Sequence, residues 1–294
     1  MTPVSESPAQ PKPVNALTVD IEDYFQVEAF SGVIDRSEWE NLPHRVEANV
    51  NAILDLFAAH DVKATFFTLG WVAERYPAMV RRLLAEGHEL ASHGYGHKRV
   101  IEQSPDEFRA DILRAKRVLE DISGSAVEGY RAPSFSIVRE SLWAHAILAE
   151  TGHRYSSSVN PIRHDLYGMQ DAPKTPYHPI AGDAFLEIPI STVQMMGHTL
   201  PCGGGGFFRL FPYAWFRAAW RHLNQSGSPF LFYFHPWEID PDQPRQANAP
   251  LKSRFRHYAR LNAMQGKIAQ ALEDFAWGRM DQAYGAYLSS QEAA

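Results

Sequence analysis

The feature that most constrains the fold is a regular alternation of short apolar runs and longer amphipathic segments along most of the chain. The apolar runs have the length of strands and are rich in β-branched and aromatic residues, as in residues 62–69. The segments between them place apolar residues three or four positions apart, which predicts helices. Alternating strands and helices favour a parallel α/β sheet, so we expect a distorted (β/α) barrel of about seven parallel strands.

The pattern also predicts the individual elements. The expected strands are residues 16–19, 62–69, 88–92, 127–130, 185–190 and 230–234. The expected helices are residues 44–60, 77–86, 139–150, 212–225 and a helix that begins after Ser104. Ser104 and Glu107 have the spacing of a capping box ahead of an apolar helical stripe, which makes this helix the best defined in the chain.

Three parts follow from this reading of the chain. Residues 1–15 are polar and rich in proline and predict a flexible tail, residues 16–237 the barrel, and residues 238–294 a helical extension packed on it. Within that extension, residues 261–277 are amphipathic and predict an appended helix. Residues 160–183 and 199–208 are expected to be long loops. The second contains the run Gly203–Gly206, which lacks the Lys-Ser/Thr of a phosphate-binding loop.

Composition narrows the chemistry and the partners. The 294-residue chain has a net charge of −6, 13 His and one Cys. A single cysteine forms no internal disulfide and no cysteine-based zinc or iron–sulfur site, so a metal would bind His, Asp or Glu. The acidic balance gives no reason to expect nucleic acid as a partner. No secretory signal or membrane-spanning stretch is evident, so we expect a cytoplasmic protein.

Two motifs at the ends of predicted strands have the composition of a metal site. His93 and His97 are four residues apart, and the glycines between them favour a turn that brings both imidazoles to one metal. Asp20, Glu22 and Asp23 crowd the end of the first strand, where like charges are unfavourable unless a cation or proton lies between them. Two histidines and a carboxylate leave ligand positions open for water and substrate. Taken alone, the two histidines also fit an accidental pair on the surface.

Two further motifs follow predicted strands. Arg131 can hold a catalytic carboxylate by a bidentate pair. The loop after it, through Pro133, Ser134 and Phe135, can present backbone N–H groups to a developing oxyanion. His235, in the segment His-Pro-Trp-Glu, follows the last strand, a position suited to a general acid in a barrel enzyme. A proline turn and a buried structural histidine are the plain alternatives.

In chain order, these four motifs resemble those of the polysaccharide deacetylases of carbohydrate esterase family 4, the NodB-homology fold. The segments VKATFF (62–67) and EGHELASH (86–93) are also similar to family sequences. The resemblance covers about residues 16–237. The segment TVDIEDYFQ (18–26), the HPWE ending and the C-terminal extension are most similar to the subgroup found in exopolysaccharide clusters that accompany the exosortase/PEP-CTERM system.

The resemblance implies a role for each motif. Asp20 is then the general base, His93 and His97 bind the metal, and His235 protonates the leaving amine. Arg131 would orient Asp20. Substrate contacts would come from Pro133, Ser134, Phe135 and Trp237, and Trp143 and Tyr95 offer further aromatic surfaces for a sugar.

The sequence departs from the family pattern at two places. The usual first motif has two adjacent aspartates, whereas here Asp20 is followed by Ile21. The third ligand is then either Glu22, on the same strand face as Asp20, or Asp23, reached by a small turn. We slightly favour Asp23, because the chain is expected to leave strand geometry there. The segment Tyr-Ser-Ser-Ser (155–158) has serine where relatives often have aspartate.

The resemblance implies a metal-dependent hydrolase, with Zn²⁺ as the expected metal and Co²⁺ or Ni²⁺ as alternatives. The expected reaction removes N-acetyl groups from amino sugars of a polysaccharide or its precursor in bacterial exopolysaccharide biosynthesis. The expected partner is therefore a carbohydrate, and the protein could associate with a membrane polysaccharide-synthesis complex; its oligomeric state is not predicted. Two alternatives stay open: a cyclic-amide hydrolase of the allantoinase type on the same fold, and a non-catalytic carbohydrate-binding protein.

Overall fold

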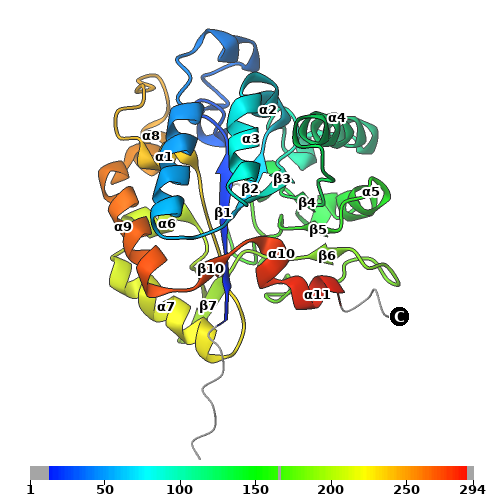
Figure 1. Cartoon of the computed structure of the whole chain (residues 1–294), viewed down its shortest axis with the longest axis vertical. Coiled ribbons are helices and arrows are strands. Elements are labelled where there is room, and N and C mark those ends of the chain that lie inside the picture. The colour runs from blue at the N-terminus through cyan, green and yellow to red at the C-terminus, as the bar shows by residue number, and fades with distance from the viewer. Residues whose placement is uncertain (1–12, 165–166, 290–294) are drawn as a thin grey trace, which may run out of the picture.

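The computed structural model describes residues 13–164 and 167–289. An eight-stranded sheet curls through its centre (Figure 1). The strand order is β10-β1-β2-β3-β4-β5-β6, and β9 also pairs with β1. Every pairing between these strands is parallel. The strands are β1 (Asn15–Ile21), β2 (Thr65–Thr68), β3 (Glu89–Ser92), β4 (Gly129–Tyr130), β5 (Tyr155–Ser156), β6 (Leu186–Glu187), β9 (Leu231–Phe234) and β10 (Trp277–Gly278). The expected α/β barrel is confirmed.

Strand β1 organises the barrel. All seven of its residues are buried, as expected for a central parallel strand covered on both faces. Strand β9 pairs along one edge, while β10 pairs with the first residues of the other edge and β2 with the last. Because all neighbours are parallel, their carboxyl ends meet at one end of the barrel, where function collects in such folds.

Helices cover the outside of this sheet. In Figure 1, α1 and α9 lie on one side of β1, and α4 and α5 on the other. The longest is α4, whose predicted capping box between Ser104 and Glu107 is present and whose C-terminal Gly124 adopts a left-handed conformation. The helices are α1 (Val46–Ala59), α2 (Gly70–Arg75), α3 (Pro77–Ala85), α4 (Pro105–Ser123), α5 (Ala144–Glu150), α6 (Gly205–Leu210), α7 (Tyr213–Gln225), α8 (Leu251–Tyr258), α9 (Leu261–Asp274), α10 (Met280–Ala283) and α11 (Gly285–Ser289).

Two of the expected helices differ from the structure. Residues 139–150 form a 3₁₀ turn followed by α5 rather than one helix. The helix expected over 261–277 ends at Asp274, and Trp277 then enters the sheet as part of β10. Trp277 packs edge-on against Trp220 and Phe230, so tertiary packing of an aromatic cluster overrides the helical pattern there. The segment after residue 237 thus supplies a strand as well as helices, and the proposed domain boundaries stay a prediction.

The glycine run is a close-packing device rather than a plain loop. Helix α6 begins at Gly205, and Gly204 forms a parallel bridge to Tyr233 of β9. A Cβ on Gly204 would meet the Tyr233 hydroxyl at 2.7 Å, and one on Gly205 would overlap the carboxylate of Glu238. The absence of side chains therefore lets α6 approach the last strand and Glu238.

The residues between β6 and α6 form a separate hairpin of β7 (Thr192–Met195) and β8 (His198–Pro201). Met196 lies in the turn of this hairpin, and its side chain is 96% exposed. Within the described residues, no helix is both long enough and apolar enough to cross a membrane.

Candidate metal and catalytic site

Asp20 lies near the carboxyl end of β1 and is held by Arg131, which follows β4. Arg131 donates Nη1 to Asp20 Oδ1 at 2.5 Å and to Thr18 Oγ1 at 2.8 Å. Its Nε and Nη2 bond the carbonyl and hydroxyl oxygens of Ser157, each at 3.1 Å. Asp20 and Arg131 are fully buried. The guanidinium thus holds the carboxylate in one orientation, and a serine of the segment 155–158 helps to fix it.

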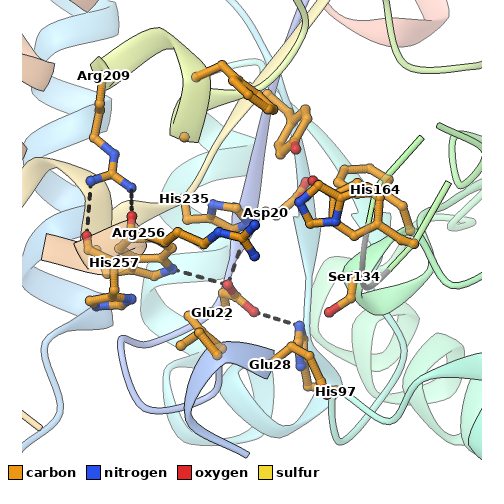
Figure 2. Close-up of a pocket in the computed structure, with 18 of the residues that line it drawn as sticks. Asp20, Glu22, Glu28, His97, Ser134, His164, Arg209, His235, Arg256 and His257 are labelled. Carbon is orange, nitrogen blue, oxygen red and sulfur yellow. Dashed lines mark hydrogen bonds and ion pairs between the residues drawn. The ribbon is translucent and has the colours of Figure 1, made fainter. Parts of the chain in front are cut away.

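Glu22, His93 and His97 form a cluster beside Asp20. One potential ligand atom from each lies within 4.8 Å of the others, and all three side chains are buried. Glu22 Oε2 is 2.7 Å from His97 Nε2, and Figure 2 shows the two groups facing one another. Among the described residues, Glu22 Oε2 nevertheless has no hydrogen bond of acceptable geometry. A buried oxygen that lies close to imidazole nitrogen without such a bond fits a shared metal between them.

Backbone contacts fix the tautomer of His93 and the turn that leads to His97. His93 Nδ1 lies 2.9 Å from the Arg131 carbonyl oxygen, which can only accept, so Nδ1 is protonated and the neutral ring has its lone pair on Nε2. Burial lowers the pKa of His93 to about 4, which keeps this ring neutral near pH 7. The turn to His97 is fixed by Asp111 of α4, which accepts from the Tyr95 amide at 2.9 Å, and by Gly94 at φ +76°. A Cβ on Gly94 would meet this Asp111 carboxylate.

The structure corrects the slight preference for Asp23 as third ligand. Strand β1 ends at Ile21, yet Glu22 still points to the side of Asp20. The following turn directs Asp23 toward α1, where its carboxylate accepts from the backbone amides of Arg45 and Val46 at 2.7 and 2.9 Å. Asp23 therefore occupies the amino end of a helix and not the metal cluster. Sequence reasoning missed this because the amides it binds come more than twenty residues later.

His235 lies near Oε1 of Glu22, whereas His97 lies near Oε2. His235 is held by the buried pair of Glu238 and Arg209, for which the sequence predicts no role. Its Nδ1 is 2.8 Å from Glu238 Oε1, and Arg209 Nε donates to Glu238 Oε2 at 2.7 Å. Burial opposes a charged imidazole, but Glu22 and Glu238 outweigh it and raise the pKa of His235 to about 9. Its Nε2 lies 3.5 Å from Glu22 Oε1. The histidine is thus a protonated group at the edge of the cluster.

The predicted substrate-contact residues have different surroundings. Ser134 and Phe135 line the cavity, and both have left-handed backbone conformations, at φ +54° and +50°. Such strain in non-glycine residues is typical of functional loops. Pro133, in the same loop, is buried and does not line the cavity. Trp237 lines the cavity too, but it donates Nε1 to Glu22 Oε1 at 3.1 Å, so it positions the cluster as well as presenting an aromatic face.

Other aromatic residues named from the sequence lie outside this cavity. Trp143 packs against Phe108 in the core, and the Tyr95 hydroxyl donates to Glu74 at 2.6 Å. The cavity itself has a volume of about 310 Å³ and lies at the carboxyl ends of the strands. Its lining also includes His164, a histidine of the predicted loop over residues 160–183 that the sequence marks as a candidate substrate contact. Further lining residues that no sequence signal identified are Glu28, Tyr167, Phe207, Arg209, Tyr233, Arg256 and His257 (Figure 2 labels four of them).

A barrel with two histidines and a carboxylate at its functional end, flanked by an arginine-held aspartate and a protonated histidine, suits metal-assisted hydrolysis. Two family models match the sequence. Residues 10–155 match the polysaccharide deacetylase family, and residues 157–285 match a domain of unknown function, DUF3473.

Curated relatives match parts of the chain. A peptidoglycan-N-acetylglucosamine deacetylase of Bacillus cereus is 39% identical over 93 residues, which are 31% of this chain and 34% of that protein. A peptidoglycan deacetylase of Helicobacter pylori is 27% identical over 49% of this chain and 45% of its own length. A chitooligosaccharide deacetylase of Bradyrhizobium is 31% identical over 37% and 47%. The chain thus spans less than half the length of each of these relatives.

Solved structures extend the likeness to the whole fold. A Mycobacterium smegmatis protein that its description assigns to the polysaccharide deacetylases superposes with a TM-score of 0.62 and 20% identity, covering 99% of this chain and 96% of that one. An allantoinase superposes with a TM-score of 0.60 and 19% identity, covering 99% and 95%. At these identities the likeness establishes the fold, and it does not choose between the two activities.

Proposed function

We propose that this protein is a metal-dependent deacetylase that removes N-acetyl groups from an amino sugar of a polysaccharide or its precursor. One observation supports this best: Asp20 and His235 line the same cavity as the cluster of Glu22, His93 and His97. Amide hydrolysis needs a base on the attacking water and an acid on the leaving nitrogen, and this arrangement supplies both. The names of the curated relatives support a sugar N-acetyl group as the target.

The proposed roles follow from the contacts. Glu22, His93 and His97 would hold a divalent metal, with Zn²⁺ favoured by the nitrogen and oxygen donor set and Co²⁺ or Ni²⁺ as alternatives. When bound, such a metal lowers the pKa of water toward about 7 and polarises a carbonyl. Arg131 holds the Asp20 carboxylate in one orientation.

In the proposed reaction, Asp20 accepts a proton as water adds to the acetyl carbonyl. His235 then gives its Nε2 proton to the sugar nitrogen, the C–N bond breaks, and acetate and a free amine are the products. Glu238 stabilises the imidazolium form of His235 before this transfer. The loop through Ser134 and Phe135 lines the side of the cavity where a backbone N–H could meet the developing oxyanion. We further propose exopolysaccharide biosynthesis as the setting, on the likeness to the subgroup stated above.

The test is acetate release from N-acetylglucosamine oligomers by metal-reconstituted protein. Asp20→Asn is expected to lower the rate by about 10²- to 10⁴-fold, because a general base contributes that much, with bound metal unchanged. The matched control is Asp121→Asn, an exposed aspartate on α4, which is expected to keep full activity.

Three results would reject the proposal or one of its parts. Ring opening of a ureide without acetate release would assign the site to the allantoinase type of reaction. Full acetate release by Asp20→Asn would remove Asp20 from the mechanism. Lack of divalent metal after reconstitution would instead favour a carbohydrate-binding protein.

A further inference from the structure

Helix α8 and the loop before it form a basic and apolar surface beside the mouth of the cavity. Residues 243–260 contain five cations and no Asp or Glu, in a chain whose net charge is −6; the cations are Arg245, Lys252, Arg254, Arg256 and Arg260. The same helix exposes two large apolar side chains, Leu251 at 79% and Phe255 at 64%. Neighbouring exposed apolar side chains mark an interaction site more often than single scattered ones do.

The helical geometry arranges these groups in an amphipathic pattern. Leu251 and Phe255 are four residues apart and form one stripe. At about 100° per residue, Lys252 falls on one side of this stripe and Arg254 on the other. His257 lies on the opposite face and is buried. An apolar stripe flanked on both sides by cations, above a buried face, is the pattern of a helix that lies in a membrane interface.

The buried face of α8 connects this surface to the candidate active site. His257 stacks on Trp237 with ring centroids 4.1 Å apart, and Trp237 donates to Glu22. Arg209 donates to the carbonyl oxygens of Arg256, His257 and Ala259 at the end of the helix. These bonds fix α8 at the cavity, where Arg256 itself lines the wall. A surface that binds α8 would therefore lie next to the mouth of the cavity.

We propose that α8 docks the protein on an anionic lipid surface, with Leu251 and Phe255 inserted among the acyl chains and the flanking cations on lipid phosphates. Charge complementarity supports a negatively charged partner, and the paired apolar side chains favour a lipid surface over a soluble polyanion, which would need cations alone. The docking is independent of the proposed deacetylation. Vesicle binding can fail while acetate release persists, and the reverse.

The test is co-flotation of the full chain with vesicles of pure phosphatidylcholine and with vesicles that also contain phosphatidylglycerol. Binding is expected only to the anionic vesicles and is expected to weaken with added salt. The double variant Leu251→Ser/Phe255→Ser is expected to lower binding by roughly tenfold or more, because two apolar anchors are lost. Lys252→Glu/Arg254→Glu is expected to lower it by about fivefold for each removed cation, and by more through the added negative charges.

Matched controls are available elsewhere on the surface. Met196→Ser removes a fully exposed apolar side chain from the β7–β8 turn, and Arg117→Glu reverses an exposed cation on α4; neither is expected to change binding. Acetate release from soluble oligomers is expected to be unchanged in Leu251→Ser/Phe255→Ser. The proposal is overturned if anionic vesicles do not bind at low salt, or if the α8 variants bind as well as wild type. It is also overturned if sedimentation shows a dimer that Phe255→Ser dissociates.

Discussion

Carboxylates at the two ends of the barrel differ in whether a cation bonds to them. At the carboxyl end, Glu238 bonds Arg209 and His235, which outweigh burial and lower its pKa. At the amino end, Glu89 accepts from the hydroxyls of Thr65 and Tyr155 and from a backbone amide, and burial raises its pKa to about 7. Burial by itself raises the pKa of a carboxyl group, and a bonded cation is what keeps the group ionised.

The two glutamates therefore differ in charge near neutral pH. Near pH 7, Glu238 stays ionised because a guanidinium and an imidazolium bond to it. Glu89 is close to half protonated at that pH, and among the described residues no cation bonds to it. Of these two carboxylates, the one beside the cavity therefore keeps its charge near pH 7, where the proposed reaction needs it.

The largest expected effect comes from removing a cation at the carboxyl end. Arg209→Met leaves Glu238 buried without its guanidinium and takes the donor from three carbonyl oxygens at the end of α8. The free energy of unfolding is expected to fall by about 3–5 kcal/mol, measured by urea denaturation. Arg117→Met, at an exposed position on α4, is the control and is expected to change it by less than about 0.5 kcal/mol. Equal stability of the two variants would contradict the comparison.

A second prediction concerns pH at the amino end. The folded state keeps a proton on Glu89 up to about pH 7, whereas the unfolded chain releases it near the ordinary value of 4.5. Rising pH therefore favours unfolding within this window, by up to roughly 3 kcal/mol in total. Glu89→Gln removes this contribution, so its stability relative to wild type is expected to increase between pH 4.5 and 7. A difference that is constant across this window, in urea titrations at several pH values, would refute the assignment.

The smallest expected effect tests the charge of Glu238 rather than its presence. Glu238→Gln keeps the size of the side chain but weakens the imidazolium form of His235. We expect kcat for acetate release to fall by about 10- to 100-fold with little change in KM or in bound metal, because the group acts through the acid. Asn248→Asp, which adds a charge on the loop before α8 outside the cavity lining, is the control. Unchanged kcat in Glu238→Gln would limit Glu238 to a structural role.

Much of the carboxyl end could be predicted from local signals. Asp20, His93, Arg131 and His235 each directly follow or end a strand pattern, and parallel strands bring such positions together. The capping box at Ser104 is local as well, and it is present as predicted. Short-range patterns were sufficient wherever the required partner lies within one turn or at the end of a neighbouring strand.

Contacts between distant segments could not be predicted in this way. Arg209 reaches Glu238 from a helix 29 residues earlier, and that helix begins inside a run of glycines, which normally argues against helix. Asp23 lies apart from the cluster of Glu22, His93 and His97 because its carboxylate accepts from backbone amides 22 and 23 residues later. The choice between Glu22 and Asp23 depended on where α1 packs, and no pattern around residue 20 contains that information.

The four identical glycines at 203–206 are not equivalent positions for future change. A side chain at Gly203, Gly204 or Gly205 would meet protein atoms at once, including those of Tyr233 and Glu238. Gly206 has no atom within 4 Å of such a Cβ, and it lines the cavity. It is therefore the position of the run at which one substitution could reshape the cavity, and with it the choice of substrate, while leaving the packing of the last strand intact.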